Sequence, residues 1–245
     1  MTNEALFYER ATTWFMRVLE QSPVAATELG AHSWDDRLGD FRPEVIEAQH
    51  QEVLEALAEF KALDLTGFSR EALIDHILLV KILDSFVRNH DKVQGHHRDP
   101  GGYLGEALGG VFMLLIREFA PLPERLRSAL GRVREVPWVL QEARLNLIPV
   151  EVPRVWAELA LEQGQQAAGL FVGLLPAIAA QALPELQDEF VKCGQVAAAA
   201  IQSYVEYIQM DILPEAAGDF AAGRELFDEL LHEQHLVDYN ADELL

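Results

Sequence analysis

The chain has 245 residues, 50% of them hydrophobic, which is enough to bury a large core as one extended domain or as two small ones. Its 19 basic and 40 acidic side chains give a formal net charge of −21, which argues against nucleic acid and anionic membranes as partners. Cys193 is the only cysteine, so intrachain disulfides are excluded, and an N-terminus without a secretory leader predicts a cytoplasmic protein.

Apolar residues recur at helical spacing through most of the chain, which predicts an all-α fold of about ten mostly antiparallel helices. In chain order, the first expected elements are a helix at 4–20, a short helix from Pro23 to near Gly30, and a loop at 32–41. Within that loop, Asp35 and Asp36 with Arg37 are typical of a turn bridged by a surface ion pair.

The next expected helix opens at Pro43 and ends at 63–67, and Ser69 is the expected N-cap of the helix after it. That second helix carries an unusually broad apolar surface and should therefore be central. The surface comprises Leu73, Ile74, Ile77, Leu78, Ile82, Phe86 and Val87. A polar loop is expected at 89–102, and a sub-boundary near 92–102 is a candidate division of a chain that otherwise reads as a single domain, 1–245.

The helix expected at 103–119 is apolar almost all round and should be buried. Proline is unsuited to a helix interior, so the later prolines should each open a new helix. They are Pro121, Pro123, Pro137, Pro149, Pro153, Pro176, Pro184 and Pro214. The longest of these runs, 184–213, should bury Val196 among others, and its small residues at 197–200 favour close packing of a second helix.

Five polar residues are candidates for a cleft or a substrate contact. Arg98 and Asp99 lie in a loop that leads to Tyr103 at the head of an apolar helix, and loops on rigid scaffolds often carry binding groups. The alternative is that Asp99 caps the helix while Arg98 pairs with a nearby acid. Arg144 and Asn146 are either buried hydrogen-bond partners or cleft residues.

No catalytic or metal-ligating residue can be assigned. The His-Glu-x-x-His pattern of zinc hydrolases is absent, and its nearest approach, His232 with His235, lacks a third ligand. Cys193 lies far from any histidine in sequence and is typical of a packed thiol. A free-standing enzyme would need catalytic residues that these patterns do not supply.

The C-terminus reads as the start of an unfinished helix. Asn240 and Glu243 form a capping-box pattern, and Leu244 and Leu245 open an apolar face that is not continued. We therefore expect the front part of a longer protein. The stretch 206–245 also holds eleven acids and one base, Arg224, which fits either a solvated face or a surface for a basic partner.

Three stretches in order, supported by Ala143-Arg144 and Asn146-Leu147, resemble the bacterial domain-of-unknown-function 885 family. They are Ala25-Ala26-Thr27-Glu28-Leu29-Gly30 with Asp35-Asp36-Arg37-Leu38, then Arg98-Asp99-Pro100 with Tyr103-Leu104, then Asp219-Phe220 with Gly223-Arg224-Glu225-Leu226-Phe227 and His235. The resemblance implies the N-terminal helical half of a cleft-type zinc metallopeptidase. The family carries a His-Glu and Gly-His-His motif in its C-terminal half, and its roles are not carried over to any residue of this chain.

The resemblance therefore implies a non-catalytic portion that forms one wall of a substrate cleft. Zinc is implied only for the missing catalytic half, and no cofactor is expected in this chain. The expected partners are that half or a second copy of the chain, with peptide as the ligand. A self-contained acidic helical module that binds other proteins is the alternative.

Overall fold

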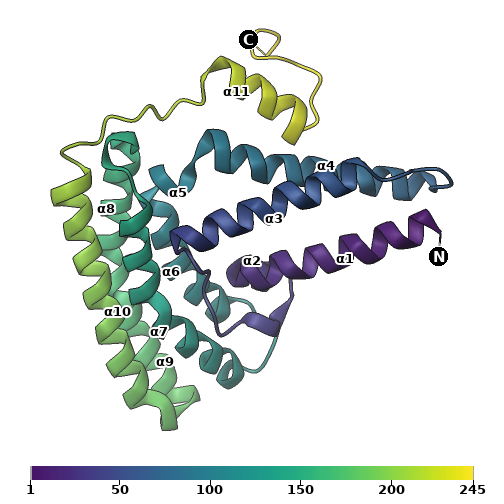
Figure 1. Cartoon of the computed structure of the whole chain (residues 1–245). Helices are drawn as coiled ribbons and strands as arrows, with labels where there is room; N and C mark the ends of the chain where they lie inside the picture. Colours follow the sequence, from purple (N-terminus) through teal and green to yellow (C-terminus); the bar gives the residue numbers. More distant parts are fainter. Residues whose placement is uncertain (1, 245) are drawn as a thin grey trace. The chain divides into compact units, whose positions relative to one another are not determined.

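The computed structural model describes residues 2–244 and confirms the all-α fold (Figure 1). Within these residues the only extended pairing is an isolated parallel bridge between Pro153 and Gly218. None of the described helices combines the length and the apolar character needed to cross a membrane.

The chain divides into two compact units, and each is built from segments that are distant in sequence. Unit 1 contains residues up to 18, then 44–95, then those from 221 onward, whereas unit 2 contains 19–43 and 96–220. One passage between the units lies between residues 95 and 96. Hydrophobic periodicity cannot reveal this organisation, because it reports which face of a helix is buried and not which helix covers it.

Unit 1 consists of helices around a small aromatic and aliphatic core. Its elements are most of α1 (Asn3–Gln21), then α3 (Pro43–Lys61), α4 (Arg70–Arg88), the π-helical turn η2 (Asn89–Val93), α11 (Gly223–Glu229) and the π-helical turn η7 (Leu230–Gln234). The core is formed by Phe7, Phe60 and Leu83 together with smaller neighbours, and the rings of Phe7 and Phe60 meet edge to face.

Two predicted caps in unit 1 are confirmed. Ser69 Oγ accepts a hydrogen bond from the backbone N–H of Ala72 at 3.2 Å, as expected for the N-cap of α4. The capping box near the C-terminus is also formed, because Asn240 Oδ1 accepts from the N–H of Glu243 and Glu243 Oε2 accepts from the N–H of Asn240. Leu244 is exposed, and Leu245 lies outside the described residues.

The predicted central position of α4 is wrong for most of its apolar surface. Its buried face is instead formed by Ala72, His76 and Leu83. Six large apolar side chains on the rest of the helix are 37–53% exposed: Leu73, Ile74, Ile77, Leu78, Ile82 and Phe86. We call these six the α4 apolar face. The helix has more apolar circumference than the partners within unit 1 can cover.

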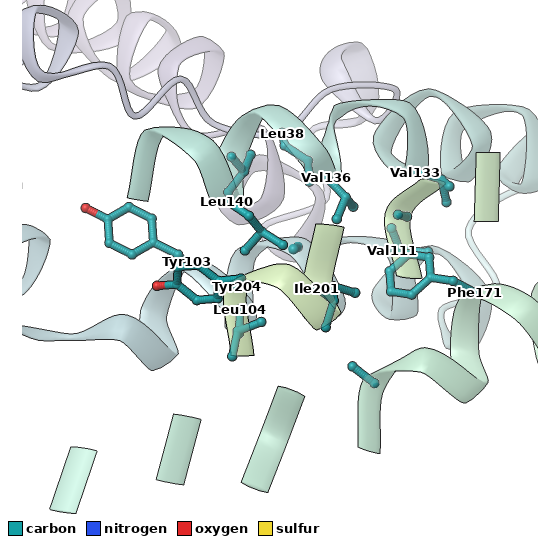
Figure 2. Close-up of a cluster of buried hydrophobic side chains, with 14 of the residues drawn as sticks. Leu38, Tyr103, Leu104, Val111, Val133, Val136, Leu140, Phe171, Ile201 and Tyr204 are labelled. Carbon is teal, nitrogen blue, oxygen red and sulfur yellow. The ribbon is translucent and has the colours of Figure 1, made fainter. Parts of the chain in front are cut away.

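Unit 2 is a larger helical body. Its elements are α2 (Pro23–Glu28), η1 (His32–Trp34), α5 (Gly95–Arg98), α6 (Pro100–Ile116), α7 (Leu122–Asn146), η3 (Pro149–Glu151), α8 (Arg154–Gly169), η4 (Leu170–Leu174), α9 (Leu175–Ala182), η5 (Pro184–Leu186), α10 (Gln187–Tyr207) and η6 (Ile208–Ile212). Helix α7 packs against α6 and α10, and α8 packs against the same two helices. Figure 2 shows the apolar side chains at their centre, among them Leu104, Val136 and Ile201.

Three expectations for the later chain are corrected. The segment 89–102 is not a loop, since η2, α5 and the first turn of α6 occupy it. Two of the prolines do not open a helix: Pro137 lies inside α7, and Pro214 lies in a turn after η6. Val196 is exposed, because the buried stripe of α10 runs through Ala197 and its helical neighbours.

The close packing expected along α10 occurs at Gly194, just before the predicted alanines. A Cβ atom at this position would overlap the carbonyl oxygen of Phe171 in η4. Glycine therefore lets the two backbones touch, which fixes η4 against α10.

Candidate functional site

The predicted residues Arg98, Asp99 and Tyr103 lie at the junction of α5 and α6 in unit 2. Asp99 is the N-cap of α6, and its Oδ1 accepts from the N–H of Gly101 at 2.9 Å. The hydroxyl of Tyr103 donates to the carbonyl of His96 at 2.7 Å. The sequence alternative in which Asp99 acts as a cap is therefore confirmed, and the cap and the tyrosine together fix the angle between the two helices.

Arg98 joins two segments that approach this junction. Its Nε donates to the carbonyl of Glu151 at 3.2 Å, and its Nη2 donates to the carbonyl of Asp219. Its guanidinium carbon lies 5.6 Å from the ring centroid of Trp156, within cation–π range. Arg98 thus holds η3 and the segment after η6 together, next to the bridge between Pro153 and Gly218.

Asn146 and Arg144 lie at the C-terminal end of α7 and differ in exposure. Asn146 is buried, its Nδ2 donates to the carbonyl of Phe41 at 2.6 Å, and its own carbonyl lies 2.7 Å from His97 Nδ1. Arg144 is half-buried and donates to Ser203 Oγ at 2.8 Å, with its guanidinium 5.0 Å from the ring of Tyr207. Asn146 is therefore a buried hydrogen-bond partner, whereas Arg144 keeps access to solvent.

Tyr204 on α10 connects these predicted residues. Its hydroxyl donates to the carbonyl of Pro100 at 3.1 Å, and Figure 2 shows its ring beside that of Tyr103. Burial raises the pKa of Tyr204 well above its ordinary value, and the charges of Asp99 and Arg144 act on it with opposite sign. Burial also raises the pKa of Tyr103. Both phenols stay protonated at neutral pH and act as hydrogen-bond donors, not as bases.

The chemistry of this cluster is mainly structural. Apart from a hydrogen bond between the side chains of Asn146 and Tyr103, the hydrogen bonds described for Arg98, Asp99, Tyr103 and Asn146 go to backbone groups of the same unit. No pair among them has the nucleophile-and-base geometry that hydrolysis requires. Arg98 and Arg144 are both partly exposed, but Arg98 donates to two backbone carbonyls whereas Arg144 donates to a side-chain hydroxyl, and whether any of the five contacts a substrate stays a prediction.

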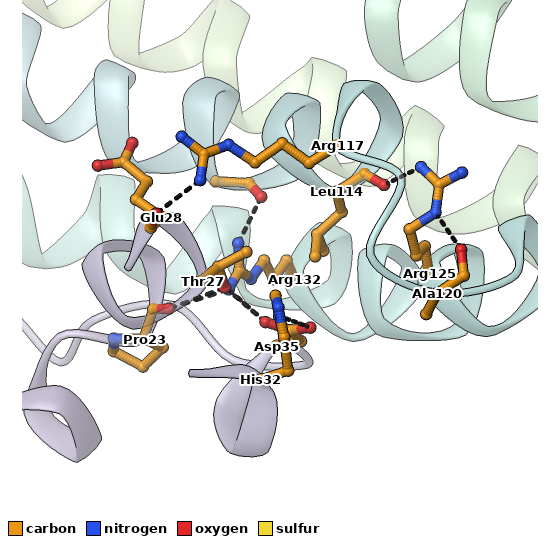
Figure 3. A network of polar contacts seen from close by, with 11 residues as sticks. Pro23, Thr27, Glu28, His32, Asp35, Leu114, Arg117, Ala120, Arg125 and Arg132 are labelled. Atoms are coloured by element: carbon orange, nitrogen blue, oxygen red, sulfur yellow. Dashed lines mark hydrogen bonds and ion pairs between the residues drawn. The ribbon is translucent and has the colours of Figure 1, made fainter. Parts of the chain in front are cut away.

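A buried network in unit 2 surrounds the fully enclosed Arg132 of α7 (Figure 3). Its Nη1 donates to the carbonyl of Gly110 at 2.5 Å, and its Nη2 donates to Thr27 Oγ1 at 2.6 Å. Asp35 Oδ1 lies 2.5 Å from the same Thr27 oxygen and 4.0 Å from Arg132 Nη2. The expected turn at Asp35 and Asp36 is present, but the surface ion pair is wrong for Asp35, because this carboxylate is buried as the counter-charge of Arg132.

Burial shifts the pKa values of the ionisable side chains in this network. It lowers the pKa of Arg132, although the nearby carboxylates Asp35 and Glu106 oppose that shift. It raises the pKa of Glu106, whose Oε1 accepts from the N–H of Gly39 at 2.8 Å. Sequence reasoning missed this network, since Thr27 and Arg132 are 105 positions apart. The one available signal was an arginine among the apolar residues of α7.

Carboxylates also hold the segment that follows Asp35. Glu135 Oε2 accepts from the N–H of Leu38 at 2.6 Å, and Glu142 Oε2 accepts from the N–H of Phe41 at 2.8 Å. Together with Glu106 they replace the hydrogen bonds that an irregular segment would otherwise leave unmade. The expected loop at 32–41 begins with η1, and the irregular part after it is firmly attached to α6 and α7.

Unit 1 holds a cluster that the sequence patterns did not indicate. His50 of α3 lies beside His90 and Asp91 of η2, and the three side chains are close enough to share one metal ion. His50 and His90 are 40 positions apart, so no short motif joins them. The sequence patterns assigned no metal ligand, whereas the structure brings these three candidate ligands together.

Comparison with known proteins places the chain among bacterial proteins. The family model described as "Bacterial protein of unknown function (DUF885)" matches residues 23–245. The chain is similar to the solved structure of "a putative lipoprotein of unknown function" from Shewanella oneidensis, with a TM-score of 0.84 and 24% identity. That match covers 97% of this chain but only 44% of the longer one. No curated protein matches.

Proposed function

Because this chain belongs to the bacterial DUF885 family, we propose that it is the non-catalytic helical N-terminal portion of a larger zinc-dependent metallopeptidase, in which it forms one wall of the substrate cleft. The Shewanella oneidensis chain, which has the same fold, is more than twice as long as the part matched here. A helical body that forms less than half of such a protein needs a surface on which the remainder packs.

The observation that carries the proposal is the α4 apolar face. Its six side chains lie on successive turns of one helix, where they gather exposed apolar area with Asp75 and Lys81 interspersed among them. Exposed apolar patches of this kind mark interaction sites on soluble proteins. The catalytic remainder of the protein is the proposed occupant, and a second copy of this chain would cover the same face when the remainder is missing.

Within the assembled protein, Arg144 is the proposed contact for a peptide carboxylate. Its guanidinium is partly exposed and lies against the ring of Tyr207, whereas the likewise partly exposed Arg98 donates to two backbone carbonyls. Burial raises the pKa of Tyr207, so the ring beside Arg144 stays neutral at physiological pH. Zinc chemistry is assigned to the remainder of the protein, since the family's His-Glu and Gly-His-His motif belongs to the C-terminal half.

Two of the acids on which the alternative function depends are already paired inside unit 1. Glu229 pairs with Arg88 and Lys92, and Glu233 pairs with Lys81. These pairs reduce the charge available to a basic partner. An acidic binding module is therefore the weaker proposal.

The test begins with the genomic locus. We expect a sequence with the His-Glu and Gly-His-His motif in frame with this one or in an adjacent gene, and its absence from both would count against the proposal. The encoded remainder is then mixed with this chain, and protection of α4 from hydrogen exchange is measured.

A charge placed on the α4 apolar face distinguishes association through this face from nonspecific hydrophobic association. Ile77→Lys should abolish association because Ile77 is 53% exposed on that face, and it should leave the melting temperature unchanged. Leu159→Lys is the matched control, since Leu159 is 51% exposed on α8 of unit 2 and does not belong to the α4 apolar face. Equal loss of association in both variants would show that α4 is not the docking surface.

A further inference from the structure

Two histidines and one aspartate converge in unit 1 between α3 and η2. His50 Nε2 lies 3.1 Å from Asp91 Oδ1, and His90 Nδ1 lies 3.0 Å from the same oxygen. The three potential ligand atoms all lie within 4.8 Å of one another. One carboxylate oxygen therefore has two imidazole nitrogens directed at it from different elements.

The two imidazole rings are held in register. Their centroids are 3.6 Å apart and their planes are 8° from parallel. Stacking keeps His50 Nε2 and His90 Nδ1 on the same side of the ring pair, where both face Asp91. The exposed fractions of the side chains are 10% for His50, 23% for His90 and 50% for Asp91, so the nitrogens are shielded while the carboxylate is open to water.

We propose that His50, His90 and Asp91 bind one divalent transition-metal ion of the Zn²⁺ type. Two imidazoles and a carboxylate suit zinc and its neighbours, whereas magnesium and calcium prefer oxygen ligands throughout. Tetrahedral ligands at about 2.1 Å from an ion are about 3.4 Å apart, so the two nitrogen–oxygen distances of 3.1 and 3.0 Å need to lengthen by only a few tenths of an ångström. One imidazole also has to rotate out of the parallel stack, so that the in-plane lone pairs of both rings point at the ion. The exposed side of Asp91 leaves a fourth position for water.

A second carboxylate is placed as an outer partner. Glu47 Oε2 lies 3.9 Å from His90 Nε2, which is the ring nitrogen that does not face Asp91. Metal-binding histidines commonly have a carboxylate or carbonyl at their second nitrogen, which orients the ring and increases its basicity. Glu47 is three residues before His50 on α3, so one helix supplies both a ligand and this outer partner.

This site is separate from the zinc chemistry assigned to the missing half. It uses residues of unit 1 alone, and an ion bound there would connect α3 to the end of α4. Its expected effect is to stabilise unit 1. A stability readout therefore tests it whether or not the proposed peptidase role is correct.

The experiment uses the full chain, stripped of metal with a chelator and titrated with ZnCl₂ in a calorimeter. We expect one Zn²⁺ per chain and a higher melting temperature. His50→Gln and His90→Gln should each weaken binding more than tenfold, because loss of an outer partner alone typically costs about 10- to 100-fold. Glu47→Gln removes only the outer partner, so it should weaken zinc binding by about 10- to 100-fold. His235→Gln is the control, since His235 lies outside the cluster.

Two further measurements keep the test independent of folding defects. Asp91→Asn changes a half-exposed side chain with little change in shape, and it should also weaken binding more than tenfold. In the unsubstituted chain, the imidazole nitrogen resonances of two histidines should shift on zinc addition and match those lost in the His50 and His90 variants. Absence of binding below about 1 mM, unchanged binding in Asp91→Asn, or equal loss in His235→Gln would overturn the proposal.

Discussion

The Thr27→Val substitution tests whether the network around Arg132 holds unit 2 together. Valine keeps the volume of threonine, so the change removes the hydroxyl and little else. That hydroxyl joins Arg132 Nη2 at 2.6 Å to Asp35 Oδ1 at 2.5 Å, and both charged groups are almost entirely buried. Without it, the remaining separation between Arg132 and Asp35 is 4.0 Å.

The expected loss follows from the two hydrogen bonds to charged groups. Each such bond contributes about 1.5–3 kcal/mol, and the guanidinium keeps its bonds to two backbone carbonyls. We expect unfolding to become easier by about 3 kcal/mol, which is roughly a hundredfold change in the equilibrium constant. Urea denaturation followed by near-ultraviolet circular dichroism measures it.

Thr13→Val is the matched control for this experiment. The hydroxyl of Thr13 is exposed and donates only to the carbonyl of Glu9 within α1, so its loss should change stability by less than about 0.5 kcal/mol. If Thr27→Val were no more destabilising than Thr13→Val, the idea that this network stabilises unit 2 would be wrong.

Three further predictions concern packing, hydrogen bonding and pH. Gly194→Ala should destabilise the chain by about 1–3 kcal/mol in thermal melts, because the new methyl group meets a facing backbone carbonyl; an unchanged melting temperature would contradict that contact. Asn146→Ala should cost about 1–3 kcal/mol in urea, since a buried carbonyl loses its donor, and a neutral result would mean that water replaces the amide. Hydrogen bonds from Lys92 and Arg88 lower the pKa of Glu229, and one from Lys81 lowers the pKa of Glu233. The stabilisation that these two ionised carboxylates give is therefore complete above the ordinary glutamate pKa of 4.5, and it is lost as the pH falls below that value. Hydrogen exchange, corrected for intrinsic rates, should show 223–234 opening in acid before the rest of unit 1, and simultaneous opening would refute this.

Local signals were read correctly from the sequence. The caps at Ser69 and Asp99 and the capping box at Asn240 depend on residues within one turn of each other, so their chemistry is visible in a short window. Helix starts at prolines were equally clear where the preceding residues favoured a turn. Pro137 was misread because only the packing of α7 shows that a helix can continue through it.

Features that depend on distant segments could not be predicted. The apolar pattern of α4 was recognised, but its neighbours within unit 1 cover only the side near Leu83. Asp35 was placed on the surface because Arg132, its counter-charge, is almost a hundred positions away. His50 and His90 gave no motif for the same reason. In each case the deciding partner is set by tertiary contacts and not by spacing.

The discontinuous make-up of the two units has a consequence for synthesis on the ribosome. Every segment of unit 2 has been translated once residue 220 is made, so that body can fold while the chain is still growing. The apolar core of unit 1 comes from residues made earlier still, but Arg88 and Lys92 receive their carboxylate partner Glu229 only from the segment after residue 220. Until that segment is made, unit 1 lacks the ion pairs that attach α11 to it.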